Sequence, residues 1–173
     1  IPFILIFSIS QINAQRVIGY YPQWVQGSFT PDRIDYDLIT HVIHSFAWPN
    51  EEGNILHYDN MLSQSISNTV HDNGAKILLS FGGGGQSWGF PASTSTPELR
   101  EIFIDNIISI CETYNYDGVD IDWEQPFSVT EKNNLTSFII ELRQAFDDIY
   151  PDWIISMAVP ISNWAGQYYD FDQ

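Results

Sequence analysis

Basic residues are scarce in this sequence. Its 173 residues include 6 Lys and Arg against 22 Asp and Glu, which gives a formal net charge of -16. A surface of that sign repels a phosphate backbone, so nucleic acid is excluded as a partner, whereas an uncharged polymer meets no such repulsion. Cysteine is scarcer still, because Cys111 is the only one. It cannot form an internal disulfide, and its apolar neighbours predict a buried side chain that acts as a small apolar group.

Long apolar runs are also lacking. The run at residues 1–9 is shorter than the roughly 20 residues that a membrane-spanning helix needs, so we expect no stable membrane insertion. Small and polar residues follow as far as Ala14, a pattern typical of the apolar region and cleavage zone of a secretory signal whose basic start is missing. We therefore predict a truncated secretory signal peptide at residues 1–15 and a secreted protein. A hydrophobic N-terminal strand and a membrane anchor are the alternatives.

The rest of the chain alternates between strand-like and helix-like periods. Strands are predicted at residues 17–21, 41–47, 76–81, 118–123 and 153–159. Helical stripes lie between them, at residues 61–70, 97–114 and 135–149, with Asn73-Gly74 and Pro151 as stop signals. This order predicts an α/β fold built from parallel βαβ units. The chain suits one domain, but it is too short for a complete (β/α)8 barrel of roughly 250 residues.

The segment 117–124, Asp-Gly-Val-Asp-Ile-Asp-Trp-Glu, interleaves acids with apolar residues. Side chains alternate between the two faces of a strand, so Asp120, Asp122 and Glu124 share one face. Acids crowded on one face raise at least one pKa, and a carboxyl group that stays protonated near neutral pH can act as a general acid. A calcium loop is the other interpretation of an acidic cluster. We reject a metal site, because strand formers occupy positions where such a loop needs glycine and flexibility.

Segment 117–124 also matches the DxxDxDxE motif of glycoside hydrolase family 18, the family of chitinases and certain endo-N-acetylglucosaminidases. Four further segments resemble the family's first, second, third and fifth strands, namely residues 16–24, 40–47, 76–83 with its SxGG motif, and 153–160. The resemblance implies that residues 16–173 are the N-terminal part of the catalytic domain. The expected fold is then an incomplete (β/α)8 TIM barrel with about its first five strands.

The resemblance implies a retaining, chitinase-like hydrolase that cleaves β-1,4-linked N-acetylglucosamine polymers without a cofactor. In this family the substrate's own acetamide acts as nucleophile. Glu124 would be the general acid and base, Asp122 would hydrogen-bond the acetamide, and Asp120 would share a proton with Asp122. The expected partners are chitin or N-acetylglucosamine oligosaccharides.

Substrate-binding residues are expected at the carboxyl ends of the strands, where barrels of this kind place their active sites. Tyr20 and Phe46 match family positions that line the cleft floor. Gly82 and Gly83 would let the loop backbone approach the sugar, and Trp88 is a candidate stacking platform. For Trp24, Trp48 and Trp164, core packing competes equally with sugar stacking. Structural roles are expected for Asp117, His41, His44 and Trp123.

Two positions depart from the family pattern. Gln125 follows the motif where the family usually has Tyr, and Gly84 follows the SxGG motif where Trp is common. A non-catalytic chitin-binding lectin on the same fold is therefore one alternative, although such relatives typically lose the acid that Glu124 represents. An endo-β-N-acetylglucosaminidase or a peptidoglycan-type hydrolase also stays open.

Overall fold

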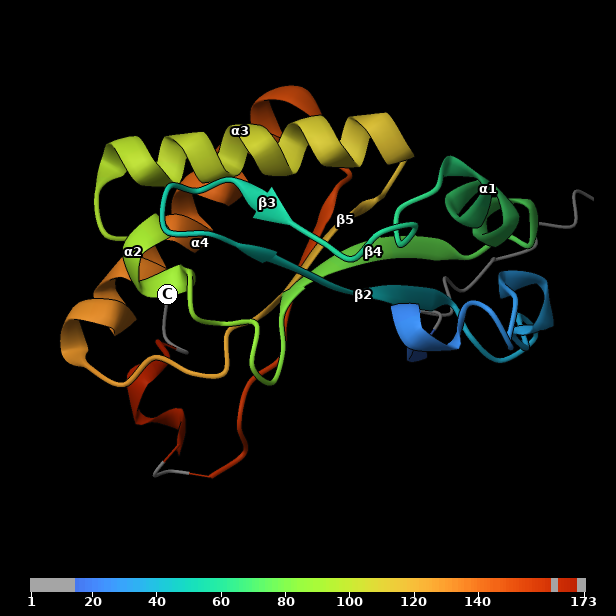
Figure 1. The fold of residues 1–173 in the computed structure, drawn as a ribbon, viewed down its shortest axis with the longest axis horizontal. Coiled ribbons are helices and arrows are strands. Elements are labelled where there is room, and N and C mark those ends of the chain that lie inside the picture. The colour runs from blue at the N-terminus through green and yellow to red at the C-terminus, as the bar shows by residue number, and fades with distance from the viewer. Residues whose placement is uncertain (1–14, 163–164, 171–173) are drawn as a thin grey trace, which may run out of the picture.

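Five parallel strands and the helices that connect them form the fold (Figure 1). The computed structural model describes residues 15–162 and 165–170. The strands are β1 (Ile18–Pro22), β2 (His41–Pro49), β3 (Ile55–Leu56), β4 (Lys76–Gly82), β5 (Gly118–Asp122) and β6 (Ile154–Met157). The α-helices are α1 (Gln64–Asp72), α2 (Phe90–Ser93), α3 (Pro97–Tyr114) and α4 (Val129–Ile149). Short 3-10 turns are η1 (Gln23–Val25), η2 (Pro31–Arg33) and η3 (Ala165–Tyr168).

The sheet confirms the predicted α/β fold. Its order is β1-β2-β4-β5-β6 with every neighbouring pair parallel, while β3 pairs antiparallel with β2. Figure 1 shows α3 lying along one face of this sheet, and α3 packs against α4. An open sheet whose consecutive parallel strands are joined by helices is the first part of a (β/α)8 barrel, as expected.

Two segments outside the predicted strands and helical stripes contain short elements. Residues 49–58 include β3, and residues 85–96 include α2. Elements of two and four residues are shorter than the window in which a hydrophobic period can be recognised. Helix α4 also begins at Val129, well before its apolar stripe, because its first turn is polar and is fixed by a cap instead.

Each long helix begins at a hydroxyl cap. The side-chain oxygen of Thr96 accepts from Leu99 N at 3.3 Å, and that of Ser128 accepts from Glu131 N at 3.1 Å. Such bonds satisfy backbone donors that the first helical turn leaves free. At the other end of α3, Asn115 adopts a left-handed conformation with φ 58°, which closes the helix and turns the chain toward β5.

The hydrophobic core lies between the sheet and the helices. Val119, Ile121 and Trp123 point into it from β5 and the residue that follows, and all three are buried. Trp123 stacks on Phe90 of α2, with ring centroids 5.1 Å apart, which confirms its predicted structural role. Because alternate residues of a strand face opposite ways, this packing directs Asp120 and Asp122 to the other face.

The sheet is curled about that other face. Tyr20 on β1 donates its hydroxyl hydrogen bond to Asp120 on β5 at 3.0 Å, although β2 and β4 lie between the two strands. Three strand spacings in a flat sheet span about 14 Å. The side chains meet because the sheet bends toward the face that carries the acids, as the wall of a barrel does.

The histidines and the cysteine behave as predicted. His44 is buried on the helix side of β2, where its Nδ1 lies 2.6 Å from the Tyr116 hydroxyl, and burial lowers the pKa of His44 to about 4. The Nδ1 of His41 lies 2.8 Å from the Thr40 hydroxyl. Cys111 is fully buried, and that burial raises the pKa of its thiol. Within residues 15–162 and 165–170, the helices are too short or too polar to cross a bilayer.

Candidate active site

The carboxyl ends of the parallel strands meet at one edge, and the predicted site residues gather there. Strand β5 ends at Asp122, so Glu124 lies in the loop just beyond the strand and not at its last position. The loop that follows β4 lies against this loop, because Gly83 N donates to Asp122 O at 2.8 Å. In Figure 1 the loops after β4, β5 and β6 gather on the same side of the sheet.

Asp120 is held by three hydroxyl groups. Ser80 and Tyr20 donate to its Oδ2 at 2.8 and 3.0 Å, and Ser156 donates to Oδ1 at 2.7 Å. Burial and the nearby Asp120 raise the pKa of Tyr20, so its hydroxyl stays a donor. The sharing of a proton between Asp120 and Asp122 stays a prediction.

Asp122 is the titratable acid of the cluster. Its residue surface is 7% exposed, and burial raises the pKa of its carboxyl group to about 6, with further contributions from the charges of Glu124 and Asp120. Among the described residues, no Lys, Arg or His forms an ion pair with any of these three acids. The negative charge of the cluster is therefore neutralised only by proton uptake or by a cationic ligand.

Glu124 is exposed and projects into a cleft of about 520 Å³. The cleft is lined by Asp122, Glu124, Gln125, Phe127, Ala158, Val159, Pro160 and Tyr169. Asp122 and Glu124 thus face one space that is open to solvent and large enough for sugar units. Sequence patterns did not single out Tyr169 or Phe127, because both lie outside the regular strands and helices that carry a period.

Ser87 fixes the backbone around the two acids. Its hydroxyl accepts from Glu124 N at 2.9 Å and lies 3.3 Å from the carbonyl oxygens of Gly83 and Asp122. One side chain thereby links the loop after β4 to the loop after β5. A lone serine in a glycine-rich loop carries no sequence signal, so this residue was missed.

The two glycines of the SxGG segment are required by close backbone contacts. A Cβ on Gly82, which has φ 111°, would lie 2.2 Å from Asp122 O. A Cβ on Gly83, with φ 80°, would lie 3.0 Å from the Phe46 ring. Their immediate role is therefore to let β4 approach the end of β5 and Phe46. A Cβ on Gly84, by contrast, would lie 3.7 Å from Glu124 Oε2.

Aromatic side chains line the β1–β2–β4 side of this edge. The Phe46 ring lies between those of Tyr20 and Trp24, with centroids 6.2 and 6.4 Å away. Trp24 is 66% exposed and Trp88, in the loop after β4, is 51% exposed. Trp48 packs edge-on against Tyr58 at 5.1 Å, and Trp164 lies outside the described residues. Exposed rings of this kind offer flat apolar faces to a ligand.

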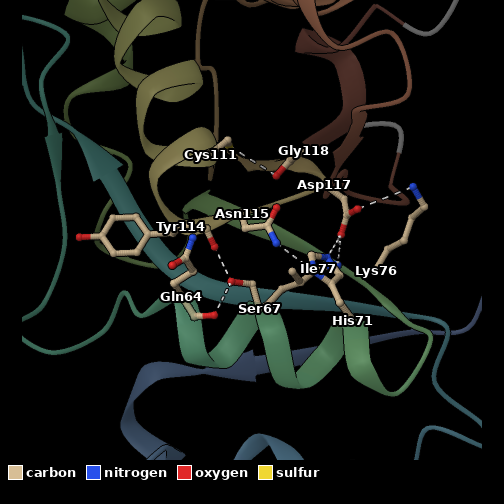
Figure 2. Close-up of polar contacts among 10 residues, drawn as sticks. All are labelled: Gln64, Ser67, His71, Lys76, Ile77, Cys111, Tyr114, Asn115, Asp117 and Gly118. Atoms are coloured by element: carbon tan, nitrogen blue, oxygen red, sulfur yellow. Dashed lines mark hydrogen bonds and ion pairs between the residues drawn. The ribbon is translucent and has the colours of Figure 1, made fainter.

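Asp117 directly precedes β5, at the end opposite the cleft, and Figure 2 shows its contacts. Its Oδ2 accepts from His71 Nε2 at 2.7 Å and from Ile77 N at 2.8 Å, while Lys76 Nζ lies 3.8 Å from Oδ1. These partners join α1, β4 and the start of β5. Asp117 is therefore a structural residue, separate from the cleft.

Across the described part of the chain, no three His, Cys, Asp or Glu side chains converge in an arrangement that could hold a metal ion.

The family "Glycosyl hydrolases family 18" matches residues 16–173. A "Probable endochitinase" of Caenorhabditis elegans is 31% identical over 145 residues, which are 73% of this chain and 23% of that protein. The human "Chitinase-3-like protein 2" is 35% identical over 146 residues, 78% of this chain and 36% of that protein. The chain thus spans about a third or less of these relatives.

Solved structures show the same fold. A group IV chitinase of Ostrinia furnacalis in complex with allosamidin superposes with a TM-score of 0.76 and 26% identity, over 88% of this chain and 45% of that one. A family 18 chitinase of Cycas revoluta in complex with allosamidin gives a TM-score of 0.78 at 24% identity, over 88% and 49% of the two chains. The present chain therefore corresponds to about half of the fold.

Proposed function

The chain belongs to glycosyl hydrolases family 18, and from that premise we propose that it is the acid-bearing half of a chitinase-like enzyme. The enzyme would cleave β-1,4-linked N-acetylglucosamine polymers with retention of configuration. The observation that carries this proposal is the uncompensated acid cluster at the carboxyl end of β5, where Asp122 and Glu124 share one cleft.

Glu124 is the general acid in this mechanism. Its carboxyl proton passes to the glycosidic oxygen, while the carbonyl oxygen of the 2-acetamido group forms a bond to the anomeric carbon and the glycosidic bond breaks. Glu124, now a carboxylate, then takes a proton from water as the water oxygen attacks the anomeric carbon and displaces the acetamide oxygen. Two inversions at one carbon give net retention, and the substrate supplies the nucleophile.

Asp122 stabilises the positive charge of the cyclic intermediate and accepts a hydrogen bond from the acetamide N–H. Its raised pKa suits this role, because Asp122 can carry a proton near neutral pH in the free enzyme and lose it as positive charge develops beside it. Asp120 holds the strand end in register through its three hydroxyl donors and adds negative charge below Asp122.

Substrate binding is assigned to the exposed aromatic rings. Tyr20, Phe46 and Trp88 are proposed to contact the sugars, and Gly82 and Gly83 to bring the loop after β4 close to them. Solved family members in complex with N-acetylglucosamine tetramers support an oligosaccharide as the ligand class.

The test is to incubate the whole protein with N-acetylglucosamine hexamer and with the fully deacetylated glucosamine hexamer. We expect cleavage of the acetylated oligomer alone, with the β-anomer formed first as seen by proton NMR. Cleavage of both would contradict participation of the acetamide group. Binding of the hexamer without any product would indicate a lectin, the alternative that the human relative's "chitinase-3-like" name leaves open.

We also propose that the protein is secreted. The apolar run at residues 1–9 precedes the family match, which begins at residue 16. Residues 1–14 lie outside the described part of the structure, so the support is the sequence alone. N-terminal sequencing of protein recovered from the culture medium should start near residue 15, and a chain retained in the cells with residues 1–15 intact would contradict this.

A further inference from the structure

Phe127 is an exposed aromatic residue that the fold does not use. Its surface is 66% exposed, and it belongs neither to the core cluster nor to the partly buried residues packed against that cluster. Phe127 directly precedes the cap of α4, a position whose apolar side chain commonly packs on the residue four places after the cap. That residue here is Lys132, so the usual apolar partner is missing.

The backbone that carries the ring is nevertheless held firmly. Phe127 N donates to Glu131 Oε2 at 2.6 Å, and Glu131 N donates to the hydroxyl of Ser128 at 3.1 Å. These two bonds tie residue 127 to the first turn of a 21-residue helix, and the preceding Pro126 is buried. Because the backbone is already fixed, an exposed ring at this position loses little conformational entropy when it binds a ligand.

Phe127 lines the cleft that contains the two acids. Asp122, Glu124 and residues 158–160 line the same cleft. Gln125, the residue beside Glu124, carries no ring and Trp123 is buried in the core, so Phe127 is the exposed aromatic side chain of this loop. The other exposed rings, such as Trp24 and Trp88, belong to the β1–β2–β4 part of the same edge.

We propose that Phe127 is a sugar-stacking platform on the β5–β6 side of Glu124, a binding subsite separate from the aromatic cluster on β1 and β2. The proposal rests on the proposed function and deepens it, because it makes the substrate an oligosaccharide that extends to both sides of Glu124. The apolar C–H face of a pyranose ring then covers the Phe127 ring, and aromatic stacking contributes affinity.

The test compares three variants of the whole protein with N-acetylglucosamine hexamer as substrate. Phe127→Ala should raise KM by about 3- to 10-fold, the effect expected of one lost stacking contact, with kcat changed less than about twofold. Phe127→Trp should keep the parent KM. Val129→Ala is the matched control, because Val129 is 67% exposed in the same segment but does not line the cleft.

Three outcomes would overturn the platform: an unchanged KM in Phe127→Ala, an equal rise in Val129→Ala, or a lowered Tm in Phe127→Ala that reveals a packing role for the ring. Failure of the proposed function is recognised separately, because the parent protein would then release no product. Calorimetric titration of the hexamer into the parent and into Phe127→Ala still decides the platform in that case, since a stacking ring contributes to binding with or without hydrolysis.

Discussion

The two ends of β5 carry acids of opposite character. At the amino end, Asp117 has a histidine, a lysine and a backbone N–H as partners (Figure 2). At the carboxyl end, Asp120 has only hydroxyl donors, and Asp122 and Glu124 face a cleft without an ion-pair partner among the described residues. One short segment of sequence therefore supplies both a structural carboxylate and the acids for which we propose a reactive role.

The difference follows from what each end of a parallel sheet must do. At the amino end, the contacts of Asp117 join α1 and β4 to β5. A carboxylate stabilises such contacts when basic partners balance its charge. At the carboxyl end, burial and then the unbalanced charges of Glu124 and Asp120 raise the pKa of Asp122 to about 6, which makes proton transfer accessible near neutral pH. Unbalanced buried charge lowers the stability of the fold, and such a cost is common at functional sites.

Apart from replacement of Glu124, the largest effect should come from Asp122→Asn in the whole protein. The amide keeps the shape but cannot carry the charge that stabilises the intermediate, so kcat should fall by about 10²- to 10³-fold, the loss typical of one preorganised electrostatic group. Steady-state rates on N-acetylglucosamine hexamer measure this. A kcat within twofold of the parent would break the contrast, because the carboxyl end would then be as structural as the amino end.

Asp117→Ala should lower stability instead of rate. The change leaves Ile77 N–H without its acceptor and separates His71 from β5, which should lower the free energy of unfolding by about 1–3 kcal/mol. Chemical denaturation measures the loss, with Asp148→Ala as the control because Asp148 is exposed on α4. Equal stability of the two variants would show that the Figure 2 contacts do not matter to the fold.

The pH dependence of stability separates the two ends further. Asp122 has a pKa of about 6 in the folded protein and about 3.9 when unfolded, so folding favours its protonated form and the parent loses stability as pH rises between these values. Asp122→Asn removes that loss. It should be about 1–3 kcal/mol more stable than the parent above pH 6 and equal to it below pH 4. A difference that does not change with pH would contradict the raised pKa.

The smallest effect is expected from Lys76→Met at the amino end. Lys76 Nζ lies 3.8 Å from Asp117 and its side chain is 46% exposed, so solvent screens the pair. The free energy of unfolding should change by less than about 0.5 kcal/mol. A loss comparable to that of Asp117→Ala would mean that the lysine, and not His71 and Ile77 N–H, balances the aspartate.

Much of the fold was predictable because apolar residues recur in its strands and helices with a regular period. The alternation in residues 118–123 and the helical stripes around Phe103 and Phe138 have periods that a sequence displays directly. The gathering of Asp122 and Glu124 with the loop after β4 follows from the rule that parallel strands share a carboxyl edge.

The rest depends on contacts that have no period. Ser80 and Ser156 lie 40 and 36 residues from Asp120 in the sequence, and strand pairing makes them its register partners on β4 and β6. The curl of the sheet then adds the hydroxyl of Tyr20 from β1. Phe127 and Tyr169 line the cleft from irregular segments, and Ser87 holds the backbone of Glu124 from another, so tertiary packing sets their geometry.

The most direct test of the account is the turnover of N-acetylglucosamine hexamer by Glu124→Gln in the whole protein. The amide cannot deliver a proton to the glycosidic oxygen, so we expect kcat to fall by about 10²- to 10⁴-fold, with the calorimetric affinity for the hexamer and the Tm close to those of the parent. Turnover at the parent rate would contradict the assignment of Glu124 as the proton donor and, with it, the reactive role of this end of β5.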